Sequence, residues 1–145
     1  MDFDLSVEIG RPPAEVFALL ADVERFAAGP GSPVVSMEKI PPGRTEVGTR
    51  WREVVRLLPG LSMTVWSVVI DLTPDARLVV DFSSVAFTGR LTYELTETTS
   101  GTRLHQRQTL EPRGPFRLVS RPMARALRPR LVERLDDIRG QLEAR

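Results

Sequence analysis

Six β-rich runs follow one another through the middle of the chain, and one long amphipathic segment follows them. The connections between the runs are short and mostly rich in Pro and Gly, and the runs span residues 34–40, 47–57, 63–72, 78–83, 87–97 and 103–111. Strands joined in series by short turns predict an antiparallel meander, because parallel strands need long crossover connections. From Phe116 to Leu142, apolar residues recur every three or four positions, which predicts a single helix with one apolar face. Pro129 inside it should kink or loosen that helix.

The N-terminal part predicts one strand and two short helices. Residues 3–9 alternate between apolar and polar side chains, as in a strand with one wet face. Pro12 and Pro13 stand where a helix begins, and Asp22 can cap a second helix that runs through Phe26.

Length and composition predict a single domain over residues 1–145. The chain contains no Cys, which excludes disulfides, thiolate metal sites and cysteine nucleophiles. The first residues are acidic, and no run approaches the roughly 18 apolar residues of a membrane span, so we expect a cytoplasmic protein.

Three separated phrases carry a resemblance to a known family. They are the stretch from Ile9 to Phe26, which includes RPPAEVFALLADVERF, then VGTRWR from Val47 to Arg52, and EPRGPF from Glu111 to Phe116. With the order of elements, they make the chain resemble the START/Bet v 1-like (SRPBCC) superfamily, in particular bacterial proteins of its polyketide cyclase/dehydrase group. The resemblance implies an α+β helix-grip fold, in which a curved seven-stranded antiparallel sheet surrounds a long C-terminal helix, with two short helices after strand one.

The same resemblance implies an internal cavity between the sheet and the C-terminal helix, filled by a hydrophobic or amphipathic small molecule such as a lipid, an aromatic or a polyketide-like compound. It does not identify that molecule, because the superfamily includes carriers, receptors, aromatase/cyclases and co-chaperones. The matching phrases serve turns, caps and packing, so they transfer no catalytic residue.

Alternation along each strand predicts which side chains point into this cavity. Leu91, Tyr93 and Leu95 form one inward row, and Leu78, Val80 and Phe82 form another. In 47–57 the Arg-rich row must face outward, which places Trp51 and Glu53 inside. In 103–111, Gln106 and Gln108 share the inward face with Leu104 and Leu110. For 63–72, where both faces are apolar, the row of Trp66, Val68, Ile70 and Leu72 is the better inward candidate.

These rows, with the apolar stripe of the helix, define the predicted ligand-binding residues. They are Trp51, Glu53, Trp66, Phe82, Phe87, Tyr93, Gln106, Gln108, Met123, Leu127 and Leu131. A few polar groups among apolar walls are typical of a small-molecule pocket. The large apolar members can equally be plain core. Glu53 can instead lie at a strand end in water or pair with an Arg, and the two glutamines can satisfy each other.

Catalytic chemistry would depend on Glu53 and Tyr93, because the only histidine, His105, falls on the outer face. A buried Glu53 would act as general acid or base, and Tyr93 would donate to a carbonyl, as in a polyketide cyclase or dehydratase. Nothing in the sequence points to a metal site or a cofactor. Whether the chain is an enzyme stays open.

The last helical segment also carries a row of arginines at successive spacings of four, four, four and three residues. They are Arg113, Arg117, Arg121, Arg125 and Arg128. Such a row can contact an anionic surface or an acidic partner, or it can simply face water. The near-neutral net charge argues against nucleic-acid binding. A protein-interaction module with a residual cavity is therefore a third reading beside ligand binding and catalysis, and a monomer and a homodimer are both open.

Overall fold

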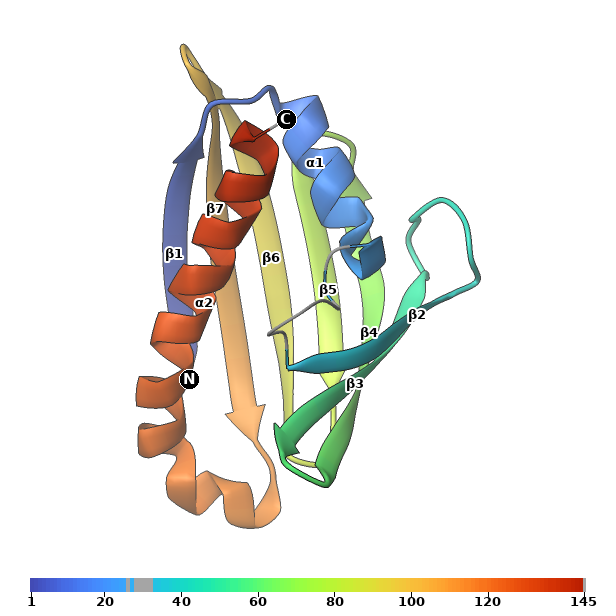
Figure 1. Cartoon of the computed structure of the whole chain (residues 1–145), viewed down its shortest axis with the longest axis vertical. Coiled ribbons are helices and arrows are strands. Elements are labelled where there is room, and N and C mark those ends of the chain that lie inside the picture. Colours follow the sequence, from blue (N-terminus) through green and yellow to red (C-terminus); the bar gives the residue numbers. More distant parts are fainter. Residues whose placement is uncertain (26, 28–32, 145) are drawn as a thin grey trace.

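The computed structural model describes residues 1–25, 27 and 33–144 (Figure 1). Its strands are β1 (Asp2–Ile9), β2 (Val34–Ile40), β3 (Arg50–Leu58), β4 (Leu61–Thr73), β5 (Arg77–Ser83), β6 (Phe87–Thr98) and β7 (Gly101–Pro112). Its helical elements are α1 (Pro13–Ala21), the 3-10 turns η1 (Val23–Arg25) and η2 (Gly114–Val119), and the long helix α2 (Ser120–Glu143).

All seven strands form one antiparallel sheet in the order β1-β7-β6-β5-β4-β3-β2. The sheet is strongly curved, and α1 and α2 lie on its concave side (Figure 1). α2 packs against β1, and α1 packs against β6 and β7. The predicted helix-grip arrangement is confirmed. Within the described ranges, no helix combines the length and the apolar character that crossing a bilayer requires.

Two helical predictions need correction. The second short helix is only the three-residue turn η1, and its predicted end at Phe26 lies outside the described residues. The C-terminal helix does not begin near Phe116: Gly114 has a left-handed φ of 55° and Pro115 follows it, so 114–119 forms the separate 3-10 turn η2. α2 then begins at Ser120, and it does contain Pro129.

The inward row predicted for β4 is also wrong in its main part. β3 places Trp51 and Glu53 opposite Ser67 and Val65, so the odd-numbered residues of this part of β4 face inward. Trp66 therefore faces outward and is 39% exposed. The cause is a β-bulge between Val69 and Asp71, where one extra residue reverses the alternation. Trp66, Val68 and Ile70 thus leave the predicted inward row, whereas Leu72, beyond the bulge, pairs with inward-facing Leu78.

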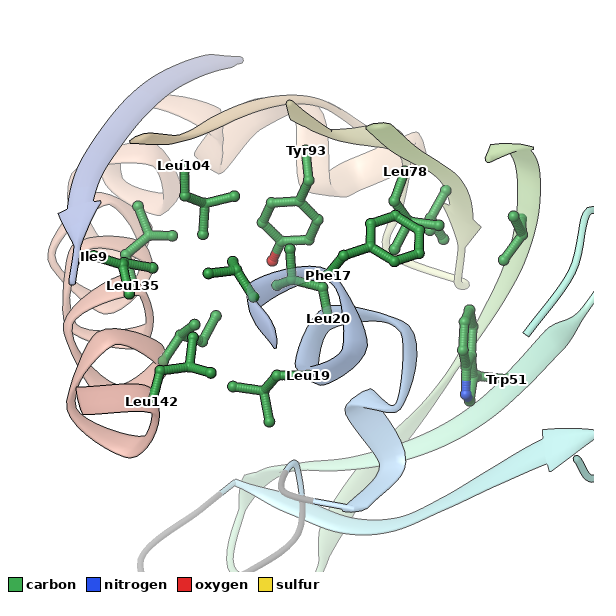
Figure 2. Packing of buried hydrophobic residues seen from close by; sticks show 14 residues of the cluster. Ile9, Phe17, Leu19, Leu20, Trp51, Leu78, Tyr93, Leu104, Leu135 and Leu142 are labelled. Atoms are coloured by element: carbon green, nitrogen blue, oxygen red, sulfur yellow. The ribbon is translucent and has the colours of Figure 1, made fainter. Parts of the chain in front are cut away.

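The concave face holds two separate apolar clusters. The larger one joins the sheet to α1 and to the C-terminal half of α2 (Figure 2). Its buried members are Ile9, Val16, Phe17, Leu19, Leu20, Trp51, Val69, Leu78, Val80, Tyr93, Leu104, Leu135, Ile138 and Leu142. The smaller one consists of Met63, Val65 and Ala86, with Val55, Phe82 and Phe87 packed against them. Hereafter these are the large cluster and the small cluster.

Two glycines are required by this geometry. Gly48 has a left-handed φ of 95°, and its N–H donates to the carbonyl of Val69 at 2.8 Å, which ties the loop before β3 to β4. At Gly89, a Cβ would lie only 2.5 Å from Cζ of Phe82. The bare backbone of β6 therefore lets the Phe82 ring lie close against the sheet.

Candidate functional site

Polar side chains interrupt the apolar surface of the concave face in two places, on β3 and β4 between the two clusters and on β7 beside the large cluster. On β3, Glu53 stands between Trp51 of the large cluster and Val55 of the small cluster. On β4, Ser67 stands between Val69 and Val65 in the same way. On β7, Gln106 and Gln108 follow Leu104 of the large cluster on the inward face. We call Glu53, Ser67, Gln106 and Gln108 the polar belt.

Gln106 is the most buried member of the polar belt, at 2% exposure. Its amide nitrogen donates to Oε1 of Gln108 at 3.0 Å, so the glutamines satisfy each other in part. Oε1 of Gln106 has no hydrogen-bond partner in the described chain. A buried acceptor without a donor is unfavourable by about 1–3 kcal/mol, so this oxygen is a natural place for a donor from outside the chain.

Tyr93 stands beside Gln106 as its cross-strand partner on β6. Its ring belongs to the large cluster, and its hydroxyl points away from the sheet toward α1 (Figure 2). Burial raises the pKa of Tyr93, and the positive charge of Arg134 opposes that rise. The phenol is therefore neutral at physiological pH and can donate a hydrogen bond.

Glu53 lies on the inward face as predicted, opposite Val65. Burial raises the pKa of Glu53, and the charge of Arg134 again acts in the opposite direction. Within the described chain, no cation lies within ion-pair distance of this carboxyl group. The protonated form of Glu53 is therefore favoured more than for a carboxyl group in water.

Arg134 on α2 is a site residue that sequence reasoning missed. Its charge acts on both Glu53 and Tyr93, which belong to two different strands of the concave face. A spacing signal was present: Arg134 lies three residues after Leu131 and four before Ile138, so this exposed residue borders the buried stripe of the helix.

The other predicted pocket residues divide into three groups. Trp51 is buried in the large cluster, where Nε1 donates to Oε2 of Glu24 at 3.0 Å, so part of its role is structural. Phe82 and Phe87 make an edge-to-face pair with ring centroids 5.8 Å apart, packed on the small cluster. On α2, Leu131 is buried, whereas Met123 and Leu127 are only half-buried.

Trp66 belongs to a different surface, on the convex side of the sheet. The guanidinium of Arg50 stacks 5.4 Å from the centre of its ring. Two shallow hollows flank this indole, with volumes of about 260 and 280 Å³. Both are lined mainly by outward-facing residues, so neither is the predicted internal cavity.

Metal and triad chemistry find no support in the geometry. Within residues 1–25, 27 and 33–144, no three His, Asp or Glu side chains gather as metal ligands. His105 lies on the convex face, where Nε2 contacts Oδ1 of Asp4. Among the described residues, the polar groups on the concave face include the carboxyl of Glu53, the phenol of Tyr93, the amides of Gln106 and Gln108 and the hydroxyl of Ser67, and the charge of Arg134 acts on this face from α2.

Comparison with known proteins identifies one family and many similar folds. Residues 1–143 match the model of the family described as polyketide cyclase/dehydrase and lipid transport.

The Zhui aromatase/cyclase from Streptomyces sp. R1128 superposes with a TM-score of 0.80 at 19% identity, covering 99% of this chain and 93% of that one. Ara h 8.0201 gives 0.78 at 14% identity, covering 100% and 99%. TTHA0849 from Thermus thermophilus gives 0.78 at 18% identity, covering 99% and 98%. At these identities the likeness shows the fold alone. Among curated proteins, none matches the sequence.

Proposed function

Because the chain belongs to the polyketide cyclase/dehydrase and lipid transport family, whose fold binds hydrophobic ligands, we propose that it binds an amphipathic small molecule against the concave face. The apolar part of the ligand would lie between the two apolar clusters and α2. Its polar part would meet the polar belt, Tyr93 and Arg134.

The observation that carries this proposal is the unpartnered Oε1 of Gln106. This oxygen is buried on the concave face and has no donor in the described chain. Tyr93 next to it offers a hydroxyl hydrogen, so the pair presents one acceptor and one donor. A ligand hydroxyl group both donates and accepts, and it therefore fits this pair better than a hydrocarbon does.

The looser packing of the N-terminal half of α2 supports access to this region. The buried side chains of α2 begin at Leu131, whereas Met123 and Leu127 are half-buried. These side chains, with Leu131, stay in our proposed ligand contacts. Trp66 does not, because it faces the convex side.

The test is a fluorescence titration with 8-anilinonaphthalene-1-sulfonate, an amphipathic probe, followed by displacement with decanol and with decane. We expect saturable binding of one probe per chain and stronger displacement by decanol than by decane of equal chain length. In Gln106→Leu, the advantage of decanol should fall by up to about tenfold, the value of one hydrogen bond.

Trp66→Ala is the matched control, because it removes the aromatic side chain of the convex hollows and leaves the concave face intact. Probe binding should be unchanged in this variant. Loss of binding in Trp66→Ala, or an unchanged advantage of decanol in Gln106→Leu, would place the probe elsewhere and contradict the proposal.

The second candidate is a cyclase or dehydratase activity, favoured by the raised pKa of Glu53. A carboxyl whose pKa is raised by burial holds its proton more tightly and can serve as general acid, and Tyr93 can hydrogen-bond a substrate carbonyl. Turnover of a poly-β-ketone thioester analogue, followed by mass spectrometry, tests this. A Glu53→Gln variant that retained the full rate would remove Glu53 from the mechanism.

A further inference from the structure

The turn η2 and the first half of α2 carry apolar side chains that the chain leaves uncovered. η2 has no buried residue at all, and Leu118 is 88% exposed. Phe116 and Val119 beside it are also exposed. Large apolar side chains grouped in this way usually mark an interaction surface, whereas single exposed ones do not.

A neighbouring turn extends this apolar patch. The N–H of Arg113 donates to the carbonyl of Ala86, and its guanidinium donates to the carbonyl of Ser84 at 3.1 Å. Val85, between these two acceptors, is 79% exposed. The turn between β5 and β6 and the turn η2 therefore present their apolar side chains at the same end of the molecule, the lower end in Figure 1.

The charge of this segment has a single sign. Between Glu111 and Glu133 there is no acidic residue, whereas arginines stand at 113, 117, 121, 125, 128 and 130. The guanidinium of Arg128 stacks 5.5 Å from the ring centre of Phe3, which fixes it on the protein. Arg117, Arg121 and Arg125 are exposed, and in the described part of the chain none of their side chains has an ion-pair or hydrogen-bond partner.

We propose that residues 113–128 dock on an anionic lipid bilayer. Phe116, Leu118 and Val119 would enter the boundary between headgroups and acyl chains, and Arg117, Arg121 and Arg125 would bind lipid phosphates. Interleaved arginines and exposed apolar residues without acidic neighbours are the composition of a segment that lies in a membrane interface.

An acidic protein surface fits this segment less well than a bilayer does. Leu118 lies directly after Arg117 and three residues before Arg121, so any surface that buries Leu118 would also meet a cation on each side of it in the sequence. A bilayer offers phosphates for these cations immediately above an apolar layer for Leu118, so it satisfies both kinds of side chain at once. The inference does not depend on the proposed internal ligand.

Co-sedimentation of the full chain with lipid vesicles tests the proposal. We expect binding to phosphatidylcholine vesicles that contain about one third phosphatidylglycerol, and at least about tenfold weaker binding to pure phosphatidylcholine. The double variant Arg121→Gln/Arg125→Gln should weaken binding to the anionic vesicles by about thirtyfold, since each basic residue near the surface contributes about a factor of five. Leu118→Ser should weaken it by about tenfold.

The controls are Arg44→Gln/Arg52→Gln and Val47→Ser, which remove exposed residues of the same kinds from β3 and the loop before it. They should bind as the original chain does. Equal binding to both vesicle types would overturn the proposal. So would an arginine effect without a Leu118 effect, because that result describes a purely electrostatic contact, as with an acidic protein.

Discussion

The two halves of α2 pack against the sheet to different degrees, so the two ends of the concave face are not equally covered. At one end, the C-terminal half of α2 buries Leu135, Ile138 and Leu142 against β1 and the sheet (Figures 1 and 2). At the other end, Met123 and Leu127 are only half-buried, and η2 buries nothing. We call these the closed end and the open end.

Polar contacts reinforce the closed end as well. Glu143 accepts a hydrogen bond from the N–H of Gly10 at 2.9 Å, and this bond, with help from Arg139, lowers the pKa of Glu143. The Nε of Arg11 donates to the carbonyl of Leu142 at 3.0 Å, so the chain after β1 is tied to the last turn of α2.

The only lysine of the chain forms a second network, at the edge of the sheet opposite β1. Nζ of Lys39 lies 2.6 Å from Oε1 of Glu24 and 3.1 Å from Oδ1 of Asp22, and it also donates to the carbonyl of Gly43. Glu24 in turn accepts from the indole of Trp51. This network joins η1 to β2 and β3.

The comparison teaches that α2 is anchored by its C-terminal half, which leaves its N-terminal half for functional contacts.

The largest test of this comparison is the same substitution at both ends of α2. Leu135→Ala should lower the free energy of unfolding by about 3 kcal/mol, because it leaves a cavity in the large cluster. Leu127→Ala should lower it by only about 1 kcal/mol, since that side chain is half-buried. Urea denaturation measures both values. Equal losses would mean that α2 packs evenly along its length.

The second test removes the lysine that joins η1 to β2. Lys39→Met should lower the free energy of unfolding by about 2–3 kcal/mol, because Glu24 and Asp22 lose a buried cation. Arg103→Met is the matched control: its pair with Glu8 at 2.6 Å is exposed and should contribute less than about 1 kcal/mol. A loss at Lys39 no larger than that at Arg103 would show that the network does not hold η1 against β2 and β3.

The fold could be predicted because most strands have one charged face. In β3 the arginines exclude one row from the interior, and in β7 Arg103 and Arg107 do the same. The inward positions of Glu53, Gln106 and Gln108 followed from this rule. The ends of the helix were harder, because η2 continues the apolar spacing of α2 although it buries nothing.

The missing parts of the site have two physical causes. β4 is apolar on both faces, and its bulge at Ile70 reverses the alternation of inward and outward side chains without any mark in the residue types. Trp66 was therefore expected to face inward, although Ser67 does. Arg134 was missed because a charged residue on a helix is ordinarily assigned to the solvent side. It stands at an exposed helix position, and its charge nevertheless acts on Glu53.

The last prediction concerns Glu53, which stands on β3 between the large and the small cluster. Its pKa is raised in the folded chain, so the folded state holds this proton more tightly than the unfolded state does. The contribution of Glu53 to stability therefore falls as pH rises from the ordinary pKa of a glutamate through the higher folded value.

Glu53→Gln removes this titration and should make the chain more stable than the original at pH 7, with the difference shrinking toward pH 4. Urea denaturation at a series of pH values measures it. In Glu97→Gln, which changes an exposed glutamate, the difference from the original chain should not vary in this way. If Glu53→Gln behaved like Glu97→Gln, the carboxyl of Glu53 would lie in water. The polar belt would then be exposed at Glu53 and would not separate two packed clusters there.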